Sequence, residues 1–286
     1  MGYFVLEGKG YDLSVLGLNV RNWIDDGPGG IKYITDKNKR ESTIMGGVAH
    51  TDNGKVSIVK PGFGPNTNID DRLASYQTST DRNVSWDWTI DLNGDITLQN
   101  DICRDYSWQA NATNPRTYGF EMVQEVKDKD TKNEKWYLYQ GQLEKAAQLF
   151  DFVNYALGIQ RQMAWDFKKN EVALYVLDRL VDWDDFCGAG THCQVSSNRG
   201  RGDAGPPLFV ILKEKYGYEC FDVAKKEDLT AWKSRQVSLG FTGKNVDGII
   251  GKGTRAAIRQ KTGFNCWVRR DQDAVYEQIL KNGVSV

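Results

Sequence analysis

The segment from Gly190 to Pro206 constrains the fold more than any other part of this 286-residue chain. It holds His192, one of only two histidines in the sequence, followed by Arg201 and Asp203 among closely spaced glycines. Glycine and proline at this density argue against a regular helix or strand and predict a long irregular loop. An ordered long loop is costly to hold in one conformation and commonly carries function. We therefore expect chemistry in this segment.

The composition is that of an ordinary globular chain, with 40% hydrophobic and 26% charged residues. A formal net charge of -1 gives no polybasic signature, which argues against nucleic acid as a partner. No apolar run approaches the roughly 20 residues that cross a bilayer, so no membrane span is expected. The N-terminus lacks the basic and apolar regions of a signal peptide, which predicts synthesis in the cytoplasm without a secretion signal.

The five cysteines bear on the redox state of the chain. An odd number disfavours a complete disulfide framework. Cys187 could pair with Cys193, or Cys220 with Cys266, in an oxidising compartment. The sequence leaves both pairings open.

Residue patterns predict a mixed α/β domain with a central sheet flanked by helices. Residues 1–40 indicate short lead-in strands, and 44–52 indicates a buried strand that ends near His50. Residues 84–98 predict a hairpin, because β-branched and aromatic residues flank the Asn-Gly pair that favours a two-residue turn. The other predicted elements are a helix over 69–76, a strand over 118–123, a helix over 142–157, an insertion over 163–186 and a helix over 208–216.

The chain is long enough for one full-sized domain and a second, smaller one. We assign residues 1–220 to the α/β domain and residues 227–286 to a small all-α domain. Its three helices are expected over 229–239, 252–262 and 271–281.

The two histidines suggest a metal centre. A catalytic zinc ion is held by three protein ligands and keeps one open position. His50 at a strand end, His192 in the loop and Asp203 beyond it would supply two imidazoles and a carboxylate. A closed structural site with Cys187, His192 and Cys193 is an alternative, although no fourth ligand lies at the usual spacing. Structural histidines beside an internally hydrogen-bonded glycine turn are the alternative without metal.

Four segments of the α/β domain carry a resemblance to a known family. They are Val48–Thr51, the hairpin over 84–98, Asn114–Met122, and the Gly190–Pro207 loop with its Arg-Gly-Asp sequence. In this order they resemble the zinc-dependent N-acetylmuramoyl-L-alanine amidase family, which is shared by phage endolysins, bacterial amidases and peptidoglycan recognition proteins. The loop is the most specific of the four matches.

The resemblance implies a catalytic set that agrees with the chemical need. Zinc lowers the pKa of bound water to about 7 and polarises the scissile carbonyl. A carboxylate then removes the proton, and a cation offsets the charge on the amide oxygen. The implied set consists of the Zn2+ ligands His50, His192 and Asp203, the general base Glu121, and the oxyanion-stabilising cation Arg201.

The sequence departs from the family pattern at four places. Thr51 stands where the family has a second histidine, and Trp86 stands where some members have an assisting tyrosine. Ala204 replaces a proline, and Arg201 replaces a lysine, which keeps the charge without the compact ammonium group. No metal ligand is removed, so we expect activity. Trp86 and Asn114 are candidates for substrate contact.

The C-terminal stretch 239–258 contains a Val-Asp-Gly turn, a second glycine and a Thr-Arg-Ala-Ala sequence. The glycines permit a tight loop before a helix. The stretch resembles the signature of the three-helix peptidoglycan-binding module, which implies peptidoglycan as a partner. The candidate contacts are Val246, Asp247, Thr254 and Arg255.

The leading hypothesis is a zinc amidase that cuts the bond between N-acetylmuramic acid and L-alanine of the stem peptide, joined to a wall-binding module. Without a signal peptide, such a chain would be a phage lysin, a virion-borne protein or the cargo of an injection machine. Virion or injection-machine components are then further partners. The alternative is a non-catalytic peptidoglycan-binding or structural virion protein that keeps the fold.

Overall fold

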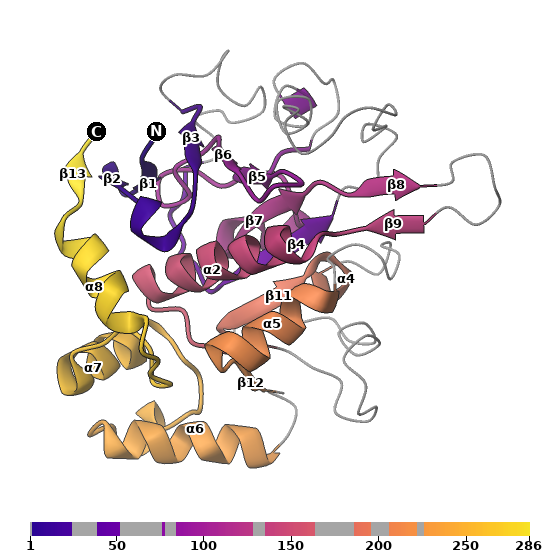
Figure 1. Ribbon diagram of the computed structural model, residues 1–286. Helices are drawn as coiled ribbons and strands as arrows, with labels where there is room; N and C mark the ends of the chain where they lie inside the picture. The colour runs from indigo at the N-terminus through magenta and orange to yellow at the C-terminus, as the bar shows by residue number, and fades with distance from the viewer. Residues whose placement is uncertain are drawn as a thin grey trace.

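The computed structural model describes residues 2–24, 39–51, 76–77, 84–127, 135–163, 186–195, 206–221 and 226–286. Within these residues a mixed eight-stranded sheet forms the centre of the molecule (Figure 1). All neighbouring strands are parallel except β5 and β6, which confirms the predicted central mixed sheet. In order across the sheet the strands are β12 (Glu219–Cys220), β10 (Gln162–Met163), β11 (Gly188–Thr191), β4 (Gly46–Thr51), β7 (Thr117–Met122), β5 (Trp88–Ile90), β6 (Ile96–Leu98) and β3 (Val20–Asn22).

One face of the sheet is apolar and lies under two helices, α2 (Gln140–Ala156) and α5 (Pro206–Tyr216) (Figure 1). Both helices confirm the predictions from the sequence. Trp88 of β5 stacks on Phe120 of β7, with ring centroids 5.4 Å apart, and Phe120 packs on Phe150 of α2. α2 also approaches β4 closely, because a Cβ atom at Gly47 would collide with the Phe150 ring. The main core therefore lies between the sheet and these helices.

The opposite face of the central strands is polar. Side chains alternate between the two faces along a strand, so the residues between the core positions point away from α2. Most of them are nonetheless buried and must be hydrogen-bonded. The buried polar residues on this face are His50, Asp87, Thr89, Thr97, Gln99 and Thr117.

The two ends of the chain meet in a second, three-stranded sheet (Figure 1). The hairpin of β1 (Phe4–Leu6) and β2 (Lys9–Tyr11) pairs with β13 (Val284–Ser285). The short lead-in strands predicted for the N-terminus are thus confirmed where the structure describes them. Phe4 ties this sheet to the core through an edge-on contact with Trp88, with ring centroids 5.5 Å apart.

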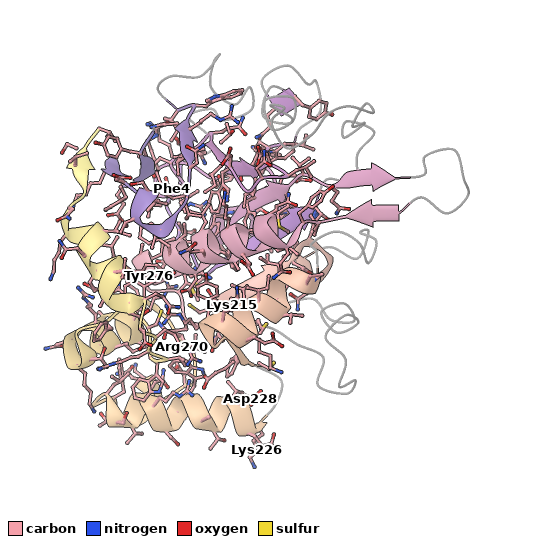
Figure 2. All side chains as sticks on the ribbon, viewed as in Figure 1. Phe4, Lys215, Lys226, Asp228, Arg270 and Tyr276 are labelled. Carbon is pink, nitrogen blue, oxygen red and sulfur yellow. The ribbon has the colours of Figure 1, made fainter. Side chains whose placement is uncertain are left out.

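Three helices follow the main body, as predicted: α6 (Lys226–Ser238), α7 (Lys252–Thr262) and α8 (Asp273–Lys281). Tyr276 of α8, which is labelled in Figure 2, packs against Phe152 and Tyr155 of α2. The helices and the body share one hydrophobic core. The division into domains between residues 220 and 227 stays a prediction.

The smaller elements connect these layers. The predicted hairpin over 84–98 is confirmed, since β5 and β6 are antiparallel. The predicted two-residue Asn-Gly turn is wrong, because the connection runs from Asp91 to Asp95 and only Gly94 of the pair has a positive φ, at 78°. The remaining elements are η1 (Ser14–Leu16), η3 (Asn111–Arg116), β8 (Glu125–Lys127), β9 (Lys135–Tyr137), α4 (His192–Val195) and η4 (Gly243–Asn245).

The prediction of an irregular loop beginning at Gly190 is wrong at its start. Gly190 and Thr191 complete β11, and His192 begins the helical turn α4. Glycine serves close packing here, because a Cβ atom at Gly188 in the same strand would collide with the carbonyl oxygen of Gln162 in β10.

Several predictions lie wholly or partly outside the described residues. These concern 69–75 of the predicted helix, 164–185 of the insertion and 196–205 of the glycine-rich segment. Cys187, Cys220 and Cys266 are free thiols, so neither of the two disulfides left open by the sequence is present. None of the described helices combines the length and the apolar character needed to cross a membrane.

Candidate metal centre

His50 and His192 meet at the carboxyl ends of two neighbouring parallel strands. The register of β11 and β4 places Thr191 beside Ala49, so the next residue of each strand brings the two histidines together. Their ring centroids are 4.5 Å apart at an interplanar angle of 75°, and each residue is only 3% exposed. The carboxyl edge of parallel strands is where open α/β sheets hold their ligands. Two residues separated by about half of the chain thus form one site.

Glu121 lies on the strand at the other side of His50. The register of β4 and β7 pairs the two residues directly, and paired residues project from the same face of a sheet. Glu121 is half-buried, whereas its neighbours Phe120 and Met122 are fully buried against the core. A carboxylate with access to solvent beside two buried imidazoles is well placed to exchange a proton with a water molecule.

A directional chain of hydrogen bonds sets the tautomer of His50. The Thr117 hydroxyl donates to the carbonyl oxygen of Thr113 at 3.0 Å, so it accepts from Gln109 Nε2 at 2.8 Å. The Gln109 amide therefore presents Oε1 to His50 Nε2 at 2.6 Å, and this imidazole nitrogen carries the proton. The lone pair of His50 then lies on Nδ1, which is the nitrogen suited to bind a metal ion.

The loop before β7 holds Gln109 in place. Asn114 Oδ1 accepts hydrogen bonds from the backbone N–H groups of Gln109 at 3.1 Å and Ala110 at 2.5 Å. The Gln109 side chain lies over Gly119, where a Cβ atom would collide with its amide. Asn114, a predicted substrate contact, is therefore a buried residue that holds this loop in place. Sequence reasoning missed Gln109, because no motif marks it and only the fold brings it to His50.

Trp86, the other predicted substrate contact in this domain, is buried beneath the same face. Its indole Nε1 donates to Thr89 Oγ1 at 2.8 Å, and its backbone N–H donates to Gln77 Oε1 at 2.7 Å. Thr89 is paired with Glu121 in the sheet. The indole N–H is thus engaged within the fold, next to the strand that carries the carboxylate.

A buried carboxylate, Asp87, supports this part of the sheet. Asp87 Oδ2 accepts from the Gly119 backbone N–H and Oδ1 accepts from Asn100 Nδ2, both at 2.7 Å. Burial raises the pKa of Asp87 to about 6, and the positive charge of Arg40 opposes this rise. The Arg40 guanidinium itself donates to the backbone carbonyls of four residues around the β7 entry, namely Ile102, Asn114, Pro115 and Thr117.

The chemistry of the described donors fits a zinc ion. Two buried imidazoles lie edge to face, and the tautomer of one is fixed by a hydrogen bond, as is usual for a metal-binding histidine. Among the described residues no group of three or more His, Cys, Asp and Glu side chains is placed to hold a metal ion. Asp203, the third predicted ligand, and Arg201, the predicted cation, lie outside the described residues.

The C-terminal signature residues form a network around Gln236 of α6. Gln236 Nε2 donates to Asp247 Oδ1 at 2.8 Å, and its Oε1 accepts from the Gly248 N–H at 2.8 Å. Thr254 is buried beside them, and Arg255 points toward the main body. The contact of Val246, Asp247, Thr254 and Arg255 with peptidoglycan stays a prediction.

Neither a search of protein-family models nor a search of curated proteins finds a match to this sequence. Solved structures similar to it include the N-acetylmuramoyl-L-alanine amidase LysC from Clostridium intestinale URNW, with 12% identity, a TM-score of 0.38, and coverage of 70% of this chain and 99% of that chain. A mutant endolysin from Bacillus subtilis has 12% identity, a TM-score of 0.32, and coverage of 48% and 75%. The hydrolase AmiA from Staphylococcus aureus, solved with its ligand, has 11% identity, a TM-score of 0.38, and coverage of 87% and 89%.

Proposed function

We propose that this chain is a zinc-dependent peptidoglycan hydrolase that cuts the amide bond between N-acetylmuramic acid and L-alanine of the stem peptide. The observation that carries the proposal is the meeting of His50 and His192 beside Glu121 at one edge of three parallel strands. The four sequence segments that resemble the zinc-dependent amidases support the same activity.

Three side chains would hold the ion: His50 through Nδ1, His192, and Asp203 from the glycine-rich segment. A zinc ion bound there supplies a water of lowered pKa and polarises the scissile carbonyl. The burial of both imidazoles limits their access to bulk water, and Gln109 prevents rotation of the His50 ring. The geometry of the two imidazoles is thereby set before the substrate arrives.

Glu121 would act as the general base and then as the general acid. It takes a proton from the attacking water and passes it to the amine of L-alanine when the amide bond breaks. Trp86 has no phenolic proton to offer, and its indole N–H already donates to Thr89. Proton transfer therefore falls to Glu121, while Arg201 would offset the charge that develops on the amide oxygen.

The C-terminal helices would add affinity for the same polymer. Their Val-Asp-Gly and Thr-Arg-Ala-Ala signature supports peptidoglycan as the partner. The protein would act at the cell wall after release or delivery, as a phage lysin, a virion-borne protein or an injected cargo.

Metal analysis combined with clearing of purified cell walls tests this proposal. We expect about one zinc ion per chain and a fall in wall turbidity with the wild-type protein. Glu121→Ala should keep the zinc and slow clearing by about 10²–10⁴-fold, which is the usual contribution of a general base to the reaction rate. Glu227→Ala, on the exposed start of α6, is the matched control and should clear walls like the wild type. Binding of walls without any clearing would instead identify a non-catalytic wall-binding protein.

Mass spectrometry of the released fragments tests which bond is cut. Free stem peptides that begin with L-alanine are the expected product. Fragments cleaved within the stem peptide or within the glycan would contradict the proposed bond specificity.

A further inference from the structure

The segment from Lys233 in α6 to Lys261 in α7 is strongly basic. It contains seven lysines and arginines and a single carboxylate, Asp247. The whole C-terminal stretch 226–286 has eleven lysines and arginines against six aspartates and glutamates, a net charge of +5, whereas the full chain has -1. Residues 1–225 therefore carry a net charge of -6, so the two parts of the chain differ in the sign of their charge.

Three of the seven cations in this segment are already used within the fold. Arg235 forms an ion pair with Glu219 of β12, and Arg259 forms one with Glu277 of α8. Arg255 is buried against the main body. The four cations that remain are all exposed lysines, namely Lys233, Lys244, Lys252 and Lys261.

Three of these lysines belong to the turn between α6 and α7 or lie against it, at the outer edge of the molecule (Figure 1). Lys244 lies in η4 within the turn, and Lys252 is the first residue of α7. A Cβ atom at Gly248 in the turn would lie 3.5 Å from Lys233 Cγ, so the Lys233 side chain extends along the turn. Lys233, Lys244 and Lys252 are named the lysine surface below.

The one carboxylate of the segment is held by the turn itself. Asp247 Oδ1 accepts from Gln236 Nε2 and from the backbone N–H of Ile249, both at 2.8 Å. Within the part of the chain that the structure describes, none of the three lysines of the lysine surface forms an ion pair. Like charges held near one another create a positive potential that attracts a polyanion.

We propose that the lysine surface binds a phosphate-rich polymer of the cell wall, of the polyol phosphate type. A lysine ammonium group recognises phosphate as a point charge, and its flexible stem needs no fixed geometry of the partner. A flexible chain with one charge in each repeat can follow lysines that are spread along a turn. The location of this polymer in the wall rests on the proposed function, whereas affinity for a polyol phosphate does not.

The surface chemistry of the same segment disfavours two other polyanions. None of the exposed residues from Lys233 to Lys261 is aromatic, so single-stranded nucleic acid finds no platform for base stacking there. Val237 is the one large hydrophobic side chain exposed in this segment, whereas binding to an anionic membrane surface uses a whole apolar face. Charge without stacking or insertion fits a polyol phosphate.

Fluorescence anisotropy with a labelled glycerol phosphate oligomer tests the lysine surface in the full-length chain. The Glu121→Ala protein is used, so that hydrolysis cannot interfere. Binding should weaken about tenfold or more when the salt concentration rises from about 50 to 200 mM, because each phosphate contact releases counterions. Binding that does not change with salt would overturn the proposal. Tighter binding of single-stranded DNA of equal charge, or of phosphatidylglycerol vesicles, would also overturn it.

Two charge-matched variants separate the lysine surface from the net charge of the protein. Combined Lys233→Gln, Lys244→Gln and Lys252→Gln should weaken oligomer binding about tenfold or more and remove most of its salt dependence. Combined Lys9→Gln, Lys213→Gln and Lys215→Gln removes the same charge from the main body and should bind like the Glu121→Ala parent. All six positions are exposed, so both variants should fold. Equal losses of affinity in the two variants would overturn the proposal.

Purified cell walls test the polymer in its proposed setting. Walls whose polyol phosphates have been removed with hydrofluoric acid should retain several-fold less Glu121→Ala protein than untreated walls, and equal retention would overturn the wall polymer as the ligand. Oligomer binding by a wild-type protein that leaves walls intact would keep the lysine surface and remove only the hydrolase. Clearing of walls without oligomer binding would remove only the lysine surface.

Discussion

The proton on His50 Nε2 is the smallest feature on which the metal centre depends. It donates to Gln109 Oε1 at 2.6 Å, and the bond between Gln109 and Thr117 sets the direction of that amide. The ligand atom of His50 is thus chosen by residues that do not touch the metal ion themselves.

Replacing Gln109 tests this dependence. Gln109→Leu keeps much of the side-chain volume and removes the acceptor, so zinc affinity should fall about 10–100-fold, the usual effect of losing such a partner. Competition with a chelator measures the affinity. Gln260→Leu, on the exposed face of α7, is the control and should bind zinc like the wild type. If both variants fold and bind zinc with equal affinity, Gln109 does not help to position His50 for the metal ion.

Asp87 should make stability depend on pH. Its pKa is about 6 in the folded chain, above the ordinary value of 3.8, because the group is buried. Between these two values the folded state binds more protons than the unfolded state. The contribution of Asp87 is therefore fully present below about pH 4 and is lost as pH rises through 6, by up to about 3 kcal/mol.

Urea unfolding of the wild type and of Asp87→Asn at several pH values isolates this contribution. The free energy of unfolding of the wild type should rise relative to that of the variant as pH falls from 7 to 4. A difference that is constant over this range would show that Asp87 does not titrate there.

At the scale of elements, local patterns predicted the strands and helices well. The hairpin of β5 and β6, the helix α2 and the three C-terminal helices all follow from short-range signals. The loop prediction failed at its start, because Gly190 lies within β11, where it pairs with Val48 of β4. Glycine density alone cannot separate a loop from a closely packed central strand.

The contact of β4 with α2 gives a matched pair of glycine substitutions. Gly47→Ala would drive a methyl group into Phe150 and Tyr118, so the free energy of unfolding should fall by about 1–3 kcal/mol. Gly141→Ala, in the first turn of α2 with open space around it, should leave stability unchanged or raise it by up to about 1 kcal/mol. Thermal or urea unfolding measures both. A Gly47→Ala variant as stable as the wild type would contradict the close approach of α2 to β4.

At the scale of the whole molecule, a buried ion triad joins the C-terminal helices to the body. Arg161 Nε donates to Asp151 of α2 at 2.8 Å, and Nη2 donates to Asp273 of α8 at 2.6 Å. All three side chains are buried. Asp273 lies 112 residues beyond Arg161 in the sequence, so no local pattern could predict the triad or the packing that it fixes.

Removing the central cation should destabilise the chain strongly. Arg161→Met leaves two buried carboxylates without the cation that neutralises them, which should lower the free energy of unfolding by about 3–5 kcal/mol. Lys215→Met breaks the exposed pair with Glu144 and should change it by less than about 1 kcal/mol. Denaturant unfolding compares the two. A loss below about 1 kcal/mol in Arg161→Met would show that the triad does not hold the helices to the body.

The candidate site was predictable only in part, because some of the contacts that support it form only in the folded chain. The two histidines and Glu121 stand in segments that the sequence marks, and the sheet register then brings them together. Gln109 and Arg161 act through contacts that only the folded chain creates.

X-ray absorption at the zinc edge tests the central claim most directly. The zinc-loaded wild type should show two imidazole nitrogens and one carboxylate oxygen at about 2.0–2.2 Å from the ion. His192→Ala should lose one imidazole from this shell and most of its zinc affinity. A shell containing thiolate sulfur, or one that is unchanged in His192→Ala, would contradict a zinc centre built from His50, His192 and Asp203.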